Sequence, residues 1–369
     1  MIKCSVGVGR NMENAEICVK EAVKDFIDPK FIVFFSEDSC FCEYARTIHS
    51  LFPNAVSIGC SSYRMWGTHG SEKKTLKVLA VEDGIEVFAN IIPKADEFAL
   101  SYADRVRDCV NRFESTENTV CVEFTVPYKN YEEYALAALN SVLLRREIPV
   151  IGGSAANDNT SETAYVALNG EIYEDGCVFA LIKNLGGAVR LYRENIYVPL
   201  TDRRFLTTKA NGVSRTIMRL GEKTAADVYA EELGVPVSEI KNYFFYNPLG
   251  RLVDGETYVT AIYESNSNGY LKNLARIHEG TDISVMKVGD YKKITEETFA
   301  KIKRENPNPS LVIFFNCLAR TILFEDENAV EDYQKRLVEE FPNIIGFSCC
   351  GEQLGTKHFN HTALFAVFE

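Results

Sequence analysis

The stretch Phe31-Ile32-Val33-Phe34-Phe35 decides the fold, because related stretches return twice further along the chain. The last copy reads Leu311-Val312-Ile313-Phe314-Phe315, and a more divergent copy occupies residues 119–124. Each run is apolar and rich in β-favouring residues, without the alternation of a half-exposed strand. Such runs are typical of strands that are buried on both faces of a sheet. The chain is therefore predicted to repeat one buried strand three times.

The segments after these strands repeat as well. Helices are expected over residues 40–51, 131–145 and 328–340. A short strand with a Gly-x-Ser ending then closes each copy: Ile58-Gly59-Cys60-Ser61, Ile151-Gly152-Gly153-Ser154 and Ile345-Gly346-Phe347-Ser348. The tripeptide Phe-Pro-Asn precedes the first and last of these endings, which is too detailed a match for chance. Strand, helix and strand of these lengths form the parallel crossover unit, so the chain is predicted to be an internal repeat of that unit.

The segments between the units are predicted to form antiparallel hairpins. The turn dipeptides Asp83-Gly84, Asn169-Gly170 and Gly186-Gly187 each separate two β-favouring runs. A different pattern follows residue 205, with two strands around Asn211-Gly212 and then a helix that Gly234 ends. We therefore expect an α/β fold with mixed β-sheets, helices packed on the outer faces, and two related domains. The domains are placed at residues 1–203 and 204–369.

Composition excludes several classes of protein. The 369 residues include 40 Lys and Arg against 52 Asp and Glu, a net charge of −12 that argues against nonspecific binding to nucleic acid or anionic membranes. The 11 cysteines are irregularly spaced and odd in number, which favours free thiols in a reducing cytosol over a disulfide scaffold. No signal-peptide core or membrane-spanning run is present in the sequence, and no attached output domain is expected. A cytoplasmic protein is expected.

Ligands of open α/β sheets bind beyond the carboxyl ends of parallel strands, and small and polar residues gather at these ends here. The predicted ligand-binding residues are Cys60, Ser61, Ser62, Arg64, Gly152, Gly153, Ser154, Asp158, Asn316, Cys317, Arg320, Cys350 and Glu352.

Each of these residue types allows a functional and a structural interpretation. Paired glycines such as Gly152-Gly153 let a ligand approach the backbone, or they simply permit a tight turn. Arg320 can clamp a carboxylate or phosphate, or pair with a neighbouring acid such as Glu352. Glu352 could instead accept a hydrogen bond from a ligand amine. Cys317 beside an arginine could be a nucleophile, but its segment holds no histidine, so a buried inert thiol is the better interpretation.

Motifs for metals and common cofactors are missing from the sequence. Cys40-x-Cys42 and Cys349-Cys350 lack the spacing of zinc ligands. No phosphate-binding Walker motif and no Gly-x-Ser-x-Gly elbow occurs, and no copy of the repeat supplies a recognisable acid–base pair. We therefore expect no cofactor, no metal and no catalytic residue.

These motifs together resemble the FIST sensory proteins over nearly the whole chain. The resemblance lies in six motifs: the Gly-Cys-Ser-Ser of residues 59–62, the Gly-Gly-Ser-Ala-Ala-Asn-Asp of 152–158, the Asn-Cys-Leu-Ala-Arg of 316–320, the Gly-Phe-Ser-Cys-Cys-Gly-Glu of 346–352, the Asn-Pro-Leu of 247–249, and the Glu-Gly of 279–280. One departure is that the family usually places Gly-Glu soon after its first motif, where this chain has Tyr63-Arg64. The reversed charge puts the ligand preference in doubt.

The resemblance implies intracellular sensing of a small ligand, with amino acids as candidates. It also implies output through a partner protein or a homo-oligomer, since relatives often carry fused output domains. The function expected is therefore signal transduction by a ligand-binding, non-enzymatic protein. Two alternatives stay open: a cysteine-dependent enzyme that acts through Cys317 on a small anionic substrate, and a protein-interaction scaffold that binds no small ligand.

Overall fold

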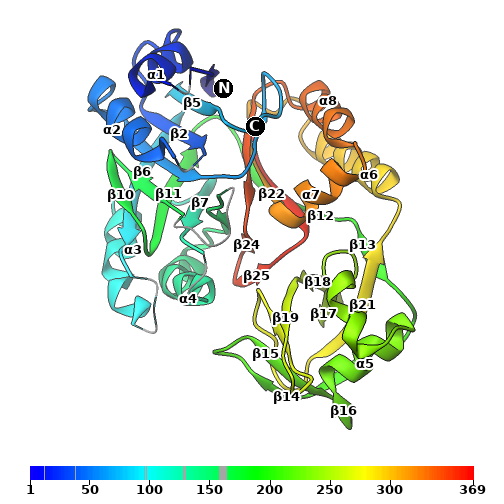
Figure 1. Cartoon of the computed structure of the whole chain (residues 1–369). Helices are drawn as coiled ribbons and strands as arrows, with labels where there is room; N and C mark the ends of the chain where they lie inside the picture. Colours follow the sequence, from blue (N-terminus) through cyan, green and yellow to red (C-terminus); the bar gives the residue numbers. More distant parts are fainter. Residues whose placement is uncertain (12, 38, 95, 97, 128–129, 158–163) are drawn as a thin grey trace. The chain divides into compact units, whose positions relative to one another are not determined.

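The computed structural model describes the chain except for residues 12, 38, 95, 97, 128–129 and 158–163. Two compact units are present (Figure 1). Unit 1 comprises Met1–Arg193, Phe299–Lys357 and Ala363–Glu369, and unit 2 comprises Glu194–Thr298 and His358–Thr362. The units divide the chain differently from the predicted domains, because the third repeat belongs to the same unit as the first two.

The three repeats each form a parallel strand pair in unit 1, as predicted. The strands and their connecting helices are β2 (Phe31–Ser36), α2 (Phe41–Leu51) and β3 (Val56–Ser61); β7 (Thr119–Thr125), α4 (Glu132–Leu143) and β8 (Val150–Ser154); β22 (Leu311–Cys317), α7 (Leu318–Asp326), α8 (Val330–Glu340) and β23 (Ile344–Cys349). The short 3-10 turn η2 (Leu144–Arg146) extends α4. The third connection contains a helix, α7, that the sequence pattern did not predict.

Antiparallel strands pair with the outer edge of the first strand of each pair, β2, β7 or β22. The sheets are therefore mixed, as expected. The inner of these strands are β5 (Leu76–Asp83), β11 (Cys177–Asn184) and β26 (Thr362–Phe368), and the outer ones are β1 (Lys3–Gly9), β6 (Ile85–Ile92) and β12 (Val189–Asn195). The strand orders are β1-β5-β2-β3-β9-β10, β6-β11-β7-β8-β24-β25 and β12-β26-β22-β23-β4.

The outer edge of the second strand of each pair, β3, β8 or β23, pairs with a strand that follows a different repeat. The strands exchanged are β4 (Met65–Gly67), β9 (Val166–Leu168) with β10 (Glu171–Tyr173), and β24 (Glu352–Leu354) with β25 (Lys357–Phe359). β4 follows the first repeat and pairs with β23 of the third; β9 follows the second and pairs with β3 of the first; β24 follows the third and pairs with β8 of the second. The exchange is cyclic, so no repeat completes its own sheet.

Two of the three predicted hairpins are wrong. The hairpin around Asn169-Gly170 is confirmed as β9–β10. At Gly84, by contrast, the chain leaves one sheet and enters another, because β5 already has β1 and β2 on its two edges and has none free for β6. The same holds at Gly186-Gly187, where β11 lies between β6 and β7 and β12 joins the third sheet instead.

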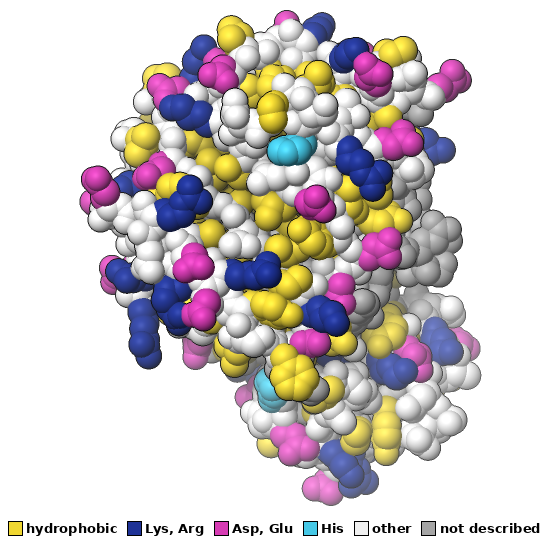
Figure 2. Space-filling view, turned by 90° about the vertical axis from the view of Figure 1, so that its left-hand side faces the viewer, with side chains coloured by type: hydrophobic (Ala, Val, Ile, Leu, Met, Phe, Trp, Pro, Cys, Tyr) yellow, Lys and Arg dark blue, Asp and Glu magenta, His cyan; other side chains and the backbone are white. Residues whose placement is uncertain are grey.

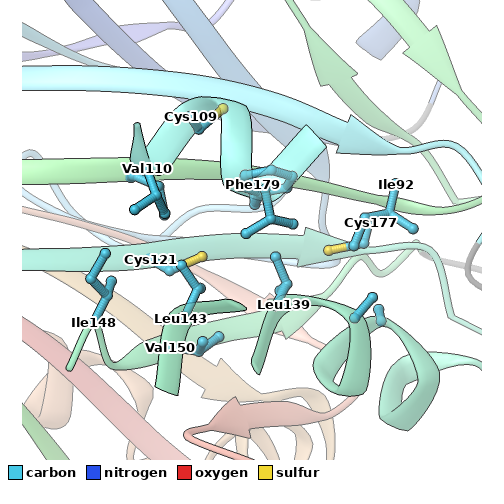
Figure 3. Close-up of a cluster of buried hydrophobic side chains, with 14 of the residues drawn as sticks. Ile92, Cys109, Val110, Cys121, Leu139, Leu143, Ile148, Val150, Cys177 and Phe179 are labelled. Atoms are coloured by element: carbon cyan, nitrogen blue, oxygen red, sulfur yellow. The ribbon is translucent and has the colours of Figure 1, made fainter. Parts of the chain in front are cut away.

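Helices cover the outer face of each sheet. They include α1 (Ala15–Val23) with α2 on the first sheet, α3 (Ala103–Val110) and the short η1 (Ala99–Tyr102) with α4 on the second, and α6 (Tyr291–Glu305) with α8 on the third. Figure 3 shows the second of these layers, where Leu139 and Leu143 of α4 face Cys121 of β7 and Val150 of β8.

The opposite faces of the three sheets meet through aromatic rings at equivalent positions. Phe35, Phe124 and Phe315 each come directly before the residue that pairs with the serine of the Gly-x-Ser ending, and Phe347 joins them. The ring centroids of Phe35 and Phe347 are 4.6 Å apart, those of Phe35 and Phe124 are 5.4 Å apart, and those of Phe124 and Phe347 are 5.5 Å apart. These contacts bury all four rings and join the repeats.

Unit 2 is built around one antiparallel sheet. Its strands are β13 (Tyr197–Pro199), β14 (Phe205–Asn211), β15 (Thr216–Leu220), β16 (Lys223–Thr224), β17 (Leu249–Val253), β18 (Glu256–Thr260), β19 (Ile262–Ser265), β20 (Leu271–Asn273) and β21 (Asp282–Val288). Helix α5 (Ala225–Leu233) and the 3-10 helix η3 (Val237–Tyr243) pack on it. The predicted strand–turn–strand–helix is confirmed, with Thr224 capping the start of α5 and Gly234 ending it at φ 71°.

The repeated glycines Gly59, Gly152 and Gly346 are explained by the close approach of the neighbouring strand. A Cβ atom at these positions would lie 2.5, 2.4 and 2.4 Å from the carbonyl oxygens of Phe34, Glu123 and Phe314. Because backbone atoms cannot move aside locally, only glycine fits at the three sites.

Replacing Gly346 with alanine should lower the free energy of unfolding by about 3 kcal/mol, because the added methyl meets a fixed carbonyl. Urea unfolding of the variant measures the loss. Gly212→Ala is the matched control, since its nearest neighbour would be 3.4 Å away, and it should change stability by less than about 1 kcal/mol. Equal stability of the two variants would contradict this explanation of the repeat.

Candidate ligand-binding site

Strand register makes Ser61, Ser154 and Ser348 equivalent positions of the three repeats. Each hydroxyl oxygen accepts a hydrogen bond from the exchanged strand or the residue before it. The donors are the Tyr165 backbone N–H, Gln353 Nε2 and Trp66 Nε1, each at 2.9 Å. The three serines are fully buried. They fasten the exchanged strands to the repeats that receive them.

These serines and the residues after them form a ring of hydrogen bonds, called here the strand-end ring: residues 61–62, 154–156 and 348–350. The Ala156 N–H donates to the Ser61 carbonyl at 2.9 Å, and the Cys350 N–H donates to the Ser154 carbonyl at 3.0 Å. The Ser62 hydroxyl donates to the Ser348 carbonyl at 3.1 Å. The structure therefore brings together the ends of all three repeats.

The third repeat adds a buried polar network to the ring. The Ser348 hydroxyl lies 2.8 Å from Thr321 Oγ1, and Asn316 Nδ2 donates to the same Thr321 oxygen at 2.9 Å. Arg320 Nη1 donates to Asn316 Oδ1 at 3.2 Å. A continuous hydrogen-bonded path thus runs from Arg320 to Trp66, the residue that joins this repeat to the first.

Arg320 is fully buried and lies just beyond the polar end of β22. Its side chain is 0% exposed, and its guanidinium carbon lies 4.9 Å from the ring centroids of both Phe324 and Tyr333. It belongs to the first turn of α7, a turn without acidic residues whose N-cap, Cys317, makes no side-chain capping bond. The helix N-terminus and the guanidinium therefore place positive potential at one end of the site.

Burial favours the protonated thiol form of Cys349 in the ring and of Cys60 beside it. Cys349 Sγ donates to Glu352 Oε1 at 3.3 Å and to the Asn316 carbonyl at 3.4 Å. Burial raises the pKa of Cys349 and of Cys60 well above the ordinary thiol value. Cys317 is also buried. This environment favours inert thiols over nucleophiles.

Several predicted residues contact protein atoms in ways that sequence could not show. A Cβ on Gly153 would lie 2.9 Å from the Cys349 Cβ, so the space beside this glycine is occupied by the third repeat. Gly152 accommodates Glu123 in the same way. The Arg64 side chain forms an ion pair with Glu325, with Nη2 and Oε1 2.9 Å apart. Asp158 lies outside the described residues.

Lys77 and Glu123 are buried charged groups of unit 1 that were not predicted. Burial lowers the pKa of Lys77 to about 7, and its amine donates to the carbonyls of Thr68 and Gly70. Burial, with a contribution from Glu132, raises the pKa of Glu123 to about 7. A signal for Glu123 existed in the sequence, because the equivalent residues of the other repeats are Phe34 and Phe314.

The Glu123 carboxyl makes stability depend on pH. The pKa of this carboxyl is 4.5 in the unfolded chain and about 7 in the folded protein. Its contribution to the free energy of unfolding is therefore fully present below pH 4.5 and is lost as the pH rises through 7. Glu123→Gln should therefore remove a decline of about 3 kcal/mol in the free energy of unfolding between pH 4.5 and 7. Chemical unfolding at several pH values tests this, with Glu171→Gln as an exposed control. An unchanged pH profile in Glu123→Gln would refute the assignment.

Thiol reactivity tests the cysteine-dependent alternative. We expect Cys60, Cys121, Cys177, Cys317 and Cys349 to resist alkylation in the folded protein and to react after unfolding, because all are buried. Mass spectrometry after a timed iodoacetamide pulse measures each site. Rapid modification of Cys317 at pH 7 would contradict the inert interpretation and restore a nucleophilic one.

The described residues hold no group of three or more His, Cys, Asp or Glu side chains placed to bind a metal. Within the same part of the chain, no helix is long and apolar enough to cross a membrane. On the face shown in Figure 2, acidic and basic side chains are interspersed rather than gathered by sign.

The fold defines a class of protein: an α/β protein whose larger unit is made from three crossover repeats with exchanged strands. The FIST N domain matches residues 30–223 and the FIST C domain matches residues 225–354, and the chain belongs to the FIST family. The resemblance stated from the motifs is thereby confirmed. FIST domains are sensory domains of signal transduction.

A relative in Methanocaldococcus jannaschii, the uncharacterized protein MJ1623, is 26% identical over 320 residues. The match covers 78% of this chain and 59% of the relative. The chain thus spans little more than half the length of that protein.

Proposed function

We propose that the protein is a cytoplasmic sensor that binds a small carboxylate-containing ligand, such as an amino acid, at the strand-end ring, and that passes the signal to a partner protein. The proposal treats the predicted residues of the ring as the contact surface and Arg320 as the group that attracts the carboxylate. Membership of a sensory family supports it.

The observation that carries this proposal is the convergence of three chemically different strand ends. Segments 61–62, 154–156 and 348–350 are joined by direct hydrogen bonds, although they lie far apart in sequence. A ligand that touches the ring would contact all three repeats at once. Small displacements there would be transmitted to the exchanged strands through Ser61, Ser154 and Ser348.

The chemistry of the ring favours a carboxylate over a phosphate dianion. Arg320 is a single guanidinium at the uncapped start of α7, which suits one negative charge. Glu352 lies two residues after the ring in sequence, is also fully buried, and contacts Cys349. A carboxylate beside the ring would oppose a second negative charge on the ligand and would favour a ligand that also carries an amine.

Thermal unfolding with a panel of amino acids, short dicarboxylates and nucleotides at 5 mM tests the proposal. At least one amino acid or carboxylate should raise the melting temperature by several degrees, since a ligand at 100 times its Kd stabilises by about 2.7 kcal/mol. Absence of any shift across the panel would count decisively against the sensor and in favour of a scaffold.

The role of Arg320 is tested by Arg320→Gln, which should weaken binding of the ligand found in that panel at least tenfold. Calorimetric titration measures the Kd. Arg107→Gln removes an exposed arginine of α3 and serves as the matched control. An unchanged Kd in folded Arg320→Gln would rule out this arginine as the attracting group.

A further inference from the structure

Lys77 occupies a position that is aliphatic in the other two three-strand units. On β5, it pairs with Phe35 of β2. In the second and third sheets, the residues that pair with the equivalent phenylalanines are Val178 and Leu364. The first sheet therefore has an amine, 0% exposed, where the other sheets have an aliphatic core side chain. Such a local departure from a repeat is where function is expected.

The amine of Lys77 binds the segment that joins the exchanged strand β4 to β5, residues 68–74, called here the strap. Its Nζ atom donates to the Thr68 carbonyl at 3.3 Å and to the Gly70 carbonyl. Two carbonyls replace only part of the water that an exposed ammonium binds, and burial lowers the pKa of Lys77 from 10.5 to about 7. The charged form of this lysine is therefore destabilised while the strap is in place.

The strap contains strained backbone and lies beside open space. His69 and Lys74 have φ of 73° and 51°, in the left-handed region that non-glycine residues rarely adopt. Such conformations persist only where surrounding contacts hold them. A groove of about 740 Å³ separates residues 69–72 from α8, where Val330 and Val338 line its other wall. The strap can therefore move into the groove while β4 and β5 stay paired in their sheets.

The charged groups around Lys77 do not offset its burial. Glu72 of the strap attracts the ammonium, and Arg10, which follows β1, repels it. These two side chains also bind each other, with Arg10 Nε and Glu72 Oε2 2.9 Å apart. Other charged or titratable groups are His69, Lys73 and Lys74 of the strap and, across the groove, Glu331, Lys335 and Glu339 of α8. Because Glu72 shares its charge with Arg10, the buried ammonium stays unfavourable.

We propose that the strap is a proton-sensitive switch: uptake of a proton by Lys77 releases residues 68–74 and widens the groove beside α8, and loss of the proton closes the strap again. The direction follows from solvation. With the strap closed the amine is buried, whereas with the strap open water solvates the ammonium. A proton binds more tightly to the exposed amine, so acidification favours the open strap.

The size of the effect follows from the two pKa values of Lys77, about 7 with the strap closed and 10.5 with the amine exposed. Between these values, the equilibrium constant for opening rises tenfold for each unit by which the pH falls, and it levels off below pH 7. The switch needs no ligand at the strand-end ring. It gives the protein a second input that is independent of the proposed small ligand.

Amide hydrogen exchange between pH 7.5 and 9, followed by NMR, tests the switch in a range above the ordinary titration of histidine. The backbone amides of Thr68, Gly70 and Glu72 donate to carbonyls of β23 and β4 at 2.8, 3.0 and 3.0 Å, so they exchange when the strap opens. Hydroxide catalyses exchange, so amides elsewhere should exchange faster in proportion to its concentration. At the three strap amides, the tenfold fall in opening per pH unit should cancel that increase and leave the rates nearly constant.

Three variants assign the effect to Lys77. Lys77→Met cannot take up a proton and restores an aliphatic side chain, so its strap amides should follow hydroxide as other amides do. Lys74→Met, an exposed lysine of the same strap, is the matched control and should keep the constant rates of the wild type. His69→Gln should keep them as well.

Strap amides that follow hydroxide in the wild type overturn the proposal, and so do constant rates in folded Lys77→Met. If Lys77→Met does not fold, the ¹³Cε shifts of the wild-type lysines decide, since one lysine should titrate near pH 7. Titration of every lysine above pH 9 would overturn the proposal. Arg320→Gln should leave the strap rates unchanged, so failure of the ring proposal and failure of this one are distinguishable.

Discussion

The edge of each parallel strand pair in unit 1 is completed by a strand that another repeat supplies. β4, β9 and β24 take these positions in cyclic order, and the buried hydroxyls of Ser61, Ser154 and Ser348 accept the hydrogen bonds that hold them. An unpaired strand edge or an unsatisfied buried hydroxyl is costly, so the repeats stabilise one another only as a closed set. The aromatic contacts of Phe35, Phe124 and Phe347 depend on the same closure.

This closure also explains where chemistry can vary. The glycines that face the neighbouring strand and the serines that bond the exchanged strands are equivalent in all three repeats. Positions that differ between repeats are free of these constraints. Two departures are chemically pronounced: the Asn316, Thr321 and Arg320 network of the third repeat, and Glu123 in place of Phe34 and Phe314 in the second. The proposed ligand site at the strand-end ring is built on the first of these departures.

Sequence reasoning predicted the three crossover units, because an unbroken apolar strand and a Gly-x-Ser ending are local features. It could not predict which sheet β6 and β12 join, since edge availability depends on strands that are distant in sequence. Helix α7 was missed because it starts at Cys317 with no capping residue and continues an apolar run. Glu123 was readable by comparing the repeats position by position, whereas the burial of Arg320 between Phe324 and Tyr333 required the fold.

The convergence of three strand ends on one ligand is tested most directly by amide chemical shifts. The uniformly ¹⁵N-labelled protein would be titrated with an equimolar mixture of the proteinogenic amino acids, and the spectra compared by residue. Saturable shifts should concentrate at residues 61–62, 154–156 and 348–350 and at the first turn of α7, with all three segments changing together. Shifts confined to one segment, or located mainly in unit 2, would contradict a site that the three repeats share.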